Sequence, residues 1–191
     1  MANIKPFQRE KILDTALILF TKNGYFNTSV QDIRRAGEVS IGSIYHYFDS
    51  KERIAAQLYY DLLADMEQAM ERIMSESSGA QERCRKVVAH LFQQAEENPK
   101  TLQFILQGRL SDFLPDEKPI CSSRPFELMR QMVEEGVRTG EVREIDRIVG
   151  AAAVFGGVLR MIQLHLDGVL PKALQEYEEE CWRCAWSAIA A

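Results

Sequence analysis

Long apolar runs are missing from this 191-residue sequence. No uninterrupted stretch approaches the roughly 20 apolar residues that a membrane-spanning helix needs. The amino terminus, MANIKPFQREKIL, has neither the apolar segment nor the small-residue cleavage site of a signal peptide. These absences predict a cytoplasmic protein without a membrane partner.

Cysteine is also scarce. Four cysteines (Cys84, Cys121, Cys181 and Cys184) are too few and too scattered in a chain of this length to form a disulfide framework. The last two match a C-x-x-C pattern in CWRC, but the sequence has no second Cys or His pair at the spacing of a metal site. We expect reduced cysteines that pack in the core, because free cysteine is among the most buried residue types. A redox role for the CWRC pair stays open.

The sequence lacks the common catalytic motifs. It has no glycine-rich phosphate loop, no H-E-x-x-H pair, no nucleophile elbow and no acidic cluster with metal-ligand spacing. The acidic run Glu178–Glu180 is more simply a solvated helix face. We therefore expect a protein that is not an enzyme, with no catalytic residues, no metal and no cofactor.

Strand patterns are absent, and the pattern that is present is helical. Apolar residues recur three and four positions apart, and Gly, Pro, Ser, Thr and Asp residues mark the helix ends. With 46% hydrophobic residues, the chain can bury one sizeable core or a small domain beside a larger one. The sequence predicts an all-α protein of about nine helices, over residues 6–23, 28–37, 40–48, 50–75, 80–97, 100–113, 122–139, 144–167 and 172–190.

Basic residues concentrate at one end of the chain, although the net charge is −5. Residues 1–51 carry seven Lys or Arg against five acids, whereas the remainder carries 16 against 23. This asymmetry is expected of a DNA-binding head on an acidic body. Chance variation in surface charge is the alternative.

Two short predicted helices on either side of the turn Gly-Glu-Val form a helix-turn-helix, whose second helix enters the major groove of DNA. Ile44 and Phe48 are four residues apart, so we expect them to hold this second helix against the rest of the domain. The residues left on or near its outer face are expected to contact phosphates and base edges. They are Gly42, Ser43, Tyr45, His46 and Tyr47.

Lys51 is expected in the first turn of the next helix, with Ser50 as its N-cap. A cation there opposes the helix dipole and needs an anion nearby, for which a DNA phosphate is the expected partner. Other roles stay open for single residues. Tyr47 also fits a position in the core, His46 a solvated polar position, and Lys51 an ion pair with Glu52 or Asp49.

Residues 7–55 resemble the helix-turn-helix signature of the tetracycline-repressor-like (TetR) family of transcriptional regulators. The similar elements are the Gly-Tyr turn, the second-helix segment TSVQDI and the recognition segment GSIYHYFDSK. The resemblance implies a homodimeric repressor that binds a palindromic or pseudopalindromic double-stranded DNA operator and is released by a small-molecule effector. It implies a DNA-binding domain over residues 1–50 and an effector-binding and dimerisation domain over residues 51–191.

The resemblance also implies DNA contacts. Ile41 departs from the family pattern, which often has Lys or another polar residue there; an apolar side chain can touch a thymine methyl group but cannot bond a phosphate or guanine. The alternative function is a helical enzyme or a protein-interaction module without DNA binding, and the module would lack salt-dependent DNA affinity. The implied contacts are Thr28, Ser29, Ser40, Gly42, Ser43, Tyr45, His46, Tyr47 and Lys51.

Beyond residue 55 only patterning guides the interpretation. The segment GAAAVFGGVL is rich in small residues, including Gly156 and Gly157, which let another helix approach closely. Trp182 and Trp186 follow at positions i and i+4 of the last predicted helix. A dimer interface through the last two helices is the favoured interpretation, and packing within one chain is the alternative.

A cavity for a small, largely apolar effector is expected where the faces of the fourth to eighth predicted helices converge. Arg109 is a candidate anchor for an anionic or carbonyl group of the ligand, and a salt bridge to Asp112 explains it nearly as well. Core packing is the alternative for each of the other candidates. These are Tyr59, Leu63, His90, Phe104, Gln107, Phe126, Met129, Phe155 and Met161.

Overall fold

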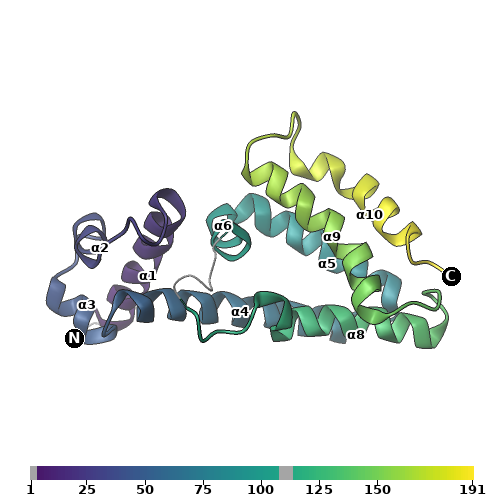
Figure 1. Cartoon of the computed structure of the whole chain (residues 1–191), viewed down its shortest axis with the longest axis horizontal. Helices are drawn as coiled ribbons and strands as arrows, with labels where there is room; N and C mark the ends of the chain where they lie inside the picture. The colour runs from purple at the N-terminus through teal and green to yellow at the C-terminus, as the bar shows by residue number, and fades with distance from the viewer. Residues whose placement is uncertain (1–3, 108–113) are drawn as a thin grey trace. The chain divides into compact units, whose positions relative to one another are not determined.

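The computed structural model describes residues 4–107 and 114–191, and side chains over residues 7–106 and 114–191. Within these ranges it contains nine α-helices, two short 3-10 helices and no β-strand, apart from one isolated antiparallel bridge between Val142 and Ala190 (Figure 1). The predicted all-α class is confirmed. The α-helices are α1 (Ile4–Asn23), α2 (Val30–Ala36), α3 (Ile41–Tyr47), α4 (Lys51–Glu76), α5 (Ala80–Glu97), α6 (Pro99–Gln107), α8 (Arg124–Thr139), α9 (Arg147–Leu166) and α10 (Glu178–Ser187), and the 3-10 helices are η1 (Ile120–Ser122) and η2 (Leu174–Tyr177).

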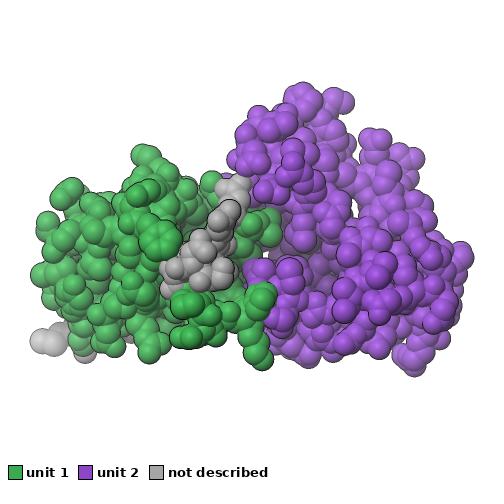
Figure 2. Space-filling model, viewed as in Figure 1, with its two compact units in different colours: residues 1–62, 100–119 green, residues 63–99, 120–191 purple. Residues whose placement is uncertain are grey.

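The chain forms two compact units, and α4 contributes residues to both (Figure 2). Unit 1 consists of residues 1–62 and 100–119, and unit 2 of residues 63–99 and 120–191. This division differs from the predicted boundary between residues 50 and 51. The difference arises because the first turns of α4, together with α6, belong to the same compact unit as the helix-turn-helix.

Unit 1 is built around aliphatic and aromatic side chains from its short helices. Ile12 of α1, Ile33 of α2 and Ile44 of α3 are each 0% exposed. Phe20 of α1 stacks on Phe104 of α6, with ring centroids 6.3 Å apart. Each of the three N-terminal helices therefore gives one face to a common core and leaves the opposite face available.

Unit 2 is organised around α5, which packs against α8, α9 and α10. Val87, Val88 and Phe92 of α5 are fully buried, and Met132 of α8 and Ile162 of α9 are buried with them. Their spacing of one, four and five positions along α5 covers more than one face, as expected of a helix with neighbours on several sides.

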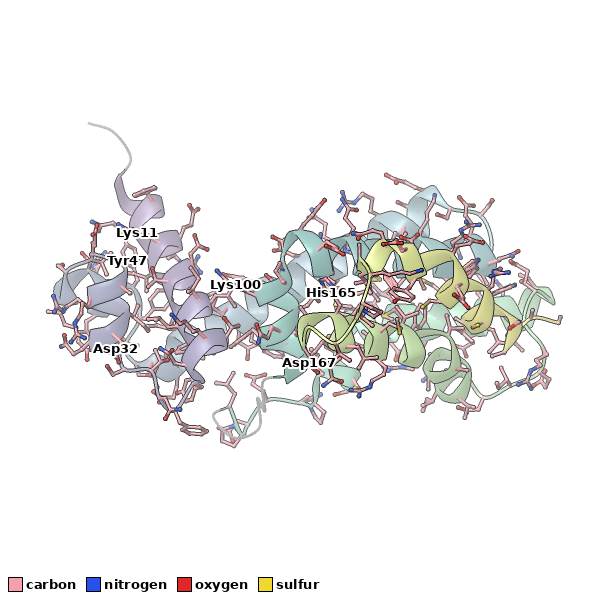
Figure 3. The ribbon with its side chains drawn as sticks, turned by 90° about the horizontal axis from the view of Figure 1, so that it is seen from above. Lys11, Asp32, Tyr47, Lys100, His165 and Asp167 are labelled. Carbon is pink, nitrogen blue, oxygen red and sulfur yellow. The ribbon has the colours of Figure 1, made fainter. Side chains whose placement is uncertain are left out.

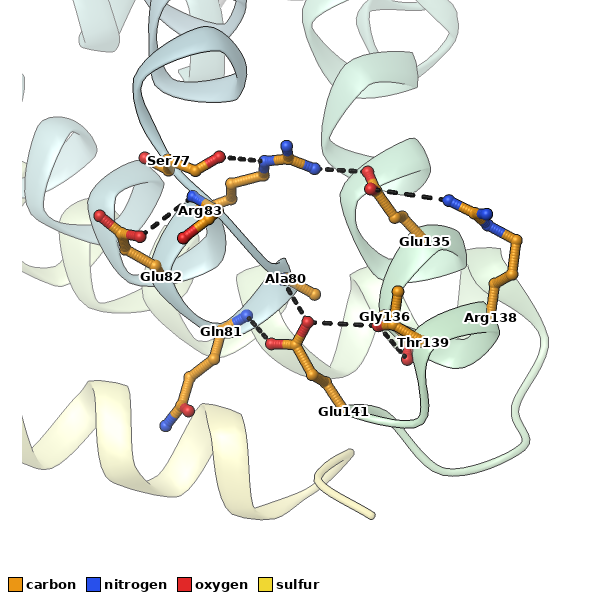
Figure 4. Close-up of polar contacts among 11 residues, drawn as sticks. Ser77, Ala80, Gln81, Glu82, Arg83, Glu135, Gly136, Arg138, Thr139 and Glu141 are labelled. Carbon is orange, nitrogen blue, oxygen red and sulfur yellow. Dashed lines mark hydrogen bonds and ion pairs between the residues drawn. The ribbon is translucent and has the colours of Figure 1, made fainter.

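The first turn of α5 is capped by a carboxylate from the segment that follows α8. Glu141 accepts hydrogen bonds from the backbone N–H groups of Ala80 and Gln81, each at 3.0 Å, and one from the Thr139 hydroxyl at 3.2 Å (Figure 4). These bonds lower the pKa of the Glu141 carboxyl, and the bond from Gln81 is the largest cause. Gly79 has a φ of +100°, and a Cβ there would lie 3.0 Å from a Glu141 oxygen, so this turn requires glycine.

Capping and distant contacts move several helix boundaries from their predicted positions. α9 begins at Arg147 rather than near residue 144, because Asp146 is its N-cap and accepts from the N–H groups two and three residues later. The helix predicted over residues 172–190 is divided into η2 and α10, and the Leu174 N–H donates to Glu96 of α5. The sixth predicted helix is described only as far as Gln107.

The cysteines differ in burial. Cys84 is 0% exposed, and burial raises the pKa of its thiol to about 12. Cys121 and Cys184 are exposed, and Cys181 is half-buried. The packing prediction is therefore confirmed for Cys84 and wrong for Cys121 and Cys184, which lie at the surface.

Candidate DNA-binding surface

The N-terminus of α2 is closed by a capping box. The Ser29 side chain accepts a hydrogen bond from the Asp32 N–H at 3.2 Å, and the Asp32 carboxylate accepts one from the Ser29 N–H at 2.9 Å. The Ser29 hydroxyl also donates to Asp32 at 2.6 Å, and this side-chain bond is the largest cause of the lowered pKa of Asp32. Ser29 is thus the N-cap of α2, inside the helix predicted over residues 28–37, and its side chain is exposed.

Thr28, for which a DNA contact was predicted, has its side chain buried inside unit 1. Its side chain is 1% exposed. Its hydroxyl donates to the backbone carbonyl of Gly24 at 2.9 Å and lies 3.3 Å from that of Leu19. The Thr28 side chain therefore stabilises the turn after α1, and it presents no surface to a phosphate.

The turn between α2 and α3 is fixed by close packing on α1. A Cβ at Gly37 would lie 3.0 Å from both the Ile33 carbonyl oxygen and the Thr15 hydroxyl. The next residue, Glu38, has a left-handed φ of 49°, which few residues other than glycine adopt. Val39 then turns inward and is buried. These contacts set the direction in which α3 leaves the turn.

α3 divides its aromatic residues between two faces, as the sequence predicts. Ile44 and Phe48 are buried, whereas Tyr45 is 54% exposed and His46 is exposed. Tyr47, which is labelled in Figure 3, is half-buried. Its ring meets that of His46 edge-on, with centroids 4.8 Å apart. The outer face of α3 therefore offers hydrogen-bonding rings to a ligand.

The N-terminal turn of α3 is polar and small. Ser40 is its N-cap and accepts a hydrogen bond from the Ser43 N–H at 2.9 Å. Ser43 also donates to the Gln8 side chain of α1 at 3.3 Å, a contact that sequence analysis missed because only the tertiary structure brings Gln8 to α3. Gly42 is exposed and Ile41 is half-buried, so both remain accessible beside the cap.

Lys51 is bound within the protein. Its ammonium donates to the backbone carbonyls of Tyr25 and Thr28, both at 2.9 Å, and lies 4.0 Å from the centre of the Tyr25 ring. The Tyr25 hydroxyl donates to Glu52 at 2.8 Å. Burial, and then this bond, raise the pKa of Tyr25 well above its ordinary value.

These contacts tie the turn after α1 to the first turn of α4. The structure thus gives Lys51 carbonyl partners instead of the predicted ion pair with Glu52 or Asp49. Two of the three ammonium protons are occupied, so the predicted phosphate contact depends on the third.

The residues predicted for a dimer interface separate into two groups. Gly156 and Gly157 are exposed, and a Cβ added at either would meet nothing within 4 Å. Trp182 is only 4% exposed and stacks on the half-buried Trp186, with centroids 5.4 Å apart. Trp182 therefore fits the alternative of packing within one chain, because its own unit already covers the indole.

α9 exposes an unusual amount of apolar surface. Its length and composition alone would suit a membrane span, a test that core helices of globular proteins also pass, yet only 28% of its most apolar window is buried. Ile148 is 62% exposed and Val149 is 56% exposed. The opposite face, with Val154 and Phe155, is buried in unit 2.

The residues predicted to line an effector cavity are distributed over both units, and the single cavity stays a prediction. Tyr59 and Phe104 are buried in unit 1, and Met129 and Phe155 in unit 2, while Leu63 and Phe126 are half-buried. His90 lines a groove between α4 and α5, whereas Met161 lies in another groove, between α9 and α10. Arg109 and the Gln107 side chain lie outside the described residues.

Two family models together match nearly the whole chain. Residues 12–58 match bacterial regulatory proteins of the tetR family. Residues 59–191 match the tetracyclin repressor-like C-terminal domain. The chain belongs to the TetR family. The two matched segments meet inside α4, and the resemblance noted over residues 7–55 is confirmed and extended.

Relatives of this TetR-family chain are transcriptional regulators. The fatty acid metabolism regulator protein of Bacillus subtilis (strain 168) is 25% identical over 151 residues, which are 78% of each chain. The transcriptional repressor KstR2 of Rhodococcus jostii (strain RHA1) is 25% identical over 143 residues, 73% of this chain and 70% of the relative. A crystal structure of FadR from Bacillus subtilis in complex with stearoyl-CoA has a TM-score of 0.78 at 20% identity and covers 94% and 98% of the two chains.

The structural likeness shows the fold, and family membership supplies the class of function. TetR-family regulators bind DNA through the helix-turn-helix and respond to a ligand through the C-terminal domain. The protein is accordingly a ligand-responsive transcriptional regulator. The predicted alternative of an interaction module without DNA binding is not supported.

Proposed function

We propose that the protein represses transcription by binding a palindromic or pseudopalindromic operator as a homodimer, and that a small, largely apolar effector releases it. The observation that carries the proposal is the outer face of α3, where Tyr45 and His46 are exposed while Ile44 anchors the helix. Such an anchored helix with accessible side chains can enter the major groove. The proposal includes a cytoplasmic location and no catalytic activity.

Within this proposal the DNA contacts have distinct roles. Gly42 allows close approach to the duplex, and the Ser29 and Ser40 hydroxyls lie at helix N-termini where phosphates are favoured. Ser43, Tyr45, His46 and Tyr47 are the side chains of α3 offered to phosphates and base edges. Ile41 reads a thymine methyl group, so Ile41→Lys should change the preferred sequence in a binding-site selection.

Fluorescence anisotropy on a selected operator at several salt concentrations tests DNA binding directly. We expect an affinity that falls steeply with salt, and Tyr45→Ala should weaken binding to every sequence because we assign it to a phosphate. A protein that selects no DNA, or binds without salt dependence, would contradict the proposal. In that outcome an interaction module becomes the better explanation.

The proposed dimer uses α9 and α10, because α9 leaves Ile148, Val149 and the glycine pair uncovered. Gly156→Leu and Trp186→Asp should each produce monomers in analytical ultracentrifugation. Val169→Asp is the matched control, since Val169 is also 62% exposed but lies beyond the end of α9. A dimer that survives both changes would place the interface elsewhere. Two-fold symmetry must set the recognition helices about 34–36 Å apart, or a multiple of that.

For the effector we propose a molecule with a long acyl chain. The support is the name of the relative in Bacillus subtilis, a fatty acid metabolism regulator, and the stearoyl-CoA bound in the similar FadR structure. Palmitoyl-CoA should raise the melting temperature and weaken operator binding, and operator should weaken palmitoyl-CoA binding by the same factor, about 5- to 150-fold. Equal palmitoyl-CoA affinities with and without operator would exclude release by this ligand.

A further inference from the structure

A groove of about 410 Å³ lies between the C-terminal half of α4 and α5, entirely within unit 2. Its volume is within the range of pockets that hold small organic ligands. One part of its wall is apolar, and the rest is polar or cationic. The lining residues are Ala69, Arg72, Ile73, Lys86, Ala89, His90, Gln93 and Gln94.

The charge of this groove is opposite to that of its surroundings. Unit 2 has 12 Lys and Arg against 18 Asp and Glu. None of the eight residues that line the groove is acidic, although Arg72 and Lys86 are cationic. By contrast, the groove of about 750 Å³ formed by the C-terminal half of α8 and the segment before α9 is lined by four acids and two arginines.

Several polar side chains of the groove have hydrogen-bond donors without a partner in the part of the chain that the structure describes. Among the described residues, Arg72 has no ion-pair or side-chain hydrogen-bond partner, and neither ring nitrogen of His90 has one. The side-chain oxygen of Gln94 accepts a hydrogen bond from the Asn98 side chain at 3.1 Å, which leaves the side-chain N–H groups of Gln94 for another acceptor. Lys86 is partly engaged, by Glu82 at 2.9 Å and by the Glu76 carbonyl at 3.4 Å.

The imidazole of His90 is half-buried in the groove. Burial lowers the pKa of His90, and the charge of Arg72 lowers it further, while Glu97 acts in the opposite direction. The guanidinium of Arg72, together with the partly engaged Lys86, lies in a groove that also has an apolar wall. This combination is complementary to a ligand that carries negative charge and some apolar surface.

We propose that the α4–α5 groove binds the anionic group, a phosphate or a carboxylate, of a small organic ligand. Arg72 and Lys86 pair with the anion, the Gln94 amide donates to it, and Ile73 with its alanine neighbours contacts the apolar part. A regulatory role for this binding rests on the proposed function. It would act through α4, which carries Arg72 and also supplies residues to unit 1. Binding itself can be measured without DNA.

NMR of the full-length protein provides the test, because the chain has only three histidines, His46, His90 and His165. Pyrophosphate and citrate are titrated separately, and His90→Asn assigns the His90 ring signal. We expect at least one anion to shift this signal saturably while the His165 signal stays unchanged. Arg72→Gln should weaken binding about tenfold or more, since a charge-assisted hydrogen bond is lost.

Arg85→Gln is the matched control. Arg85 is the neighbour of Lys86 on α5, but it pairs with Glu179 at 2.7 Å and does not line the groove. Its variant should bind the anion with unchanged affinity, and sodium chloride at equal ionic strength should not reproduce the shift. Which anion binds distinguishes a phosphate ligand from a carboxylate ligand.

Three results would overturn the proposal: no shift of His90 with either anion, an equal shift with chloride, or undiminished binding in a folded Arg72→Gln protein. Each result is independent of operator binding, so the absence of anion binding in the groove would leave the repressor proposal intact. Conversely, saturable anion binding in a protein that binds no DNA would support the groove and contradict the repressor.

Discussion

The helix caps within unit 1, which contains the helix-turn-helix, and the cap of α5 within unit 2 differ in how far apart the bonded residues lie in the sequence. In unit 1, Ser29 and Ser40 cap their helices through the N–H group three residues ahead. In unit 2, the first turn of α5 depends on Glu141, 60 and 61 residues away from the two N–H groups it caps. The difference teaches that the starts of α2 and α3 are encoded by near neighbours in the sequence, whereas the cap of α5 exists only once distant segments meet.

The largest expected effect separates two neighbours on α3. Ile44→Ala should lower the free energy of unfolding by about 2–5 kcal/mol, because it empties a fully buried site. Tyr45→Ala should change it by less than about 0.5 kcal/mol but weaken DNA binding. Urea denaturation and anisotropy on both variants measure the two effects. Equal destabilisation would show that the α3 face serves packing rather than DNA.

Substitutions at two glycines, Gly136 and Gly156, test the long-range packing of unit 2. Gly136→Ala should cost about 1–3 kcal/mol of unfolding free energy, as the added methyl group would lie 2.6 Å from side-chain carbons of Ala80 and Val142. Gly156→Ala, with nothing within 4 Å, should be neutral or slightly stabilising in the protomer. Thermal unfolding compares the two. Similar melting temperatures would mean that the contact between α5 and α8 yields easily.

Loss of the Glu141 cap should have a smaller effect on the free energy of unfolding, and this effect should depend on pH. Glu141→Ala should cost about 0.5–2 kcal/mol at neutral pH, as for other lost helix caps. Because the folded-state pKa of Glu141 is lowered, its stabilisation is full above the ordinary glutamate value of about 4.3 and is lost as the pH falls through the folded value. Denaturation at about pH 6 and about pH 3 checks this sign.

Glu144→Ala is the control for the Glu141 variant, since Glu144 is exposed and lies in the same segment between α8 and α9. It should have no effect at either pH. A penalty for Glu141→Ala that did not shrink in acid would show that its charge is not what caps α5.

The smallest expected effect concerns salt. Lys51→Met should lower stability and DNA affinity by releasing the turn after α1, yet leave the salt dependence of binding unchanged, because its ammonium already bonds two carbonyls. A phosphate contact would instead lower the slope of log affinity against log salt by about 0.9. Anisotropy across salt concentrations decides between these roles, with Lys51→Arg as the variant that keeps the charge.

Much of the recognition helix was predictable from the sequence. The Ser40 cap and the spacing of Ile44 and Phe48 are local features, so the exposure of Tyr45 and His46 follows from helical periodicity. The burial of Thr28 could not be predicted, because its hydroxyl bonds the carbonyls of Leu19 and Gly24 only in the folded unit. The carbonyl partners of Lys51 could not be predicted either, because they lie 23 and 26 residues earlier in the chain.

The sequence by itself determined the all-α class, most helices and the outward face of α3, since these depend on side-chain periodicity and on hydrogen bonds between near neighbours. Only the tertiary structure decided that Glu141 caps α5, that Trp182 is buried in its own chain, and that Arg72 and His90 share a groove. Each of these depends on which surfaces of different helices meet, and a helix with several apolar faces does not specify its neighbours through its own periodicity.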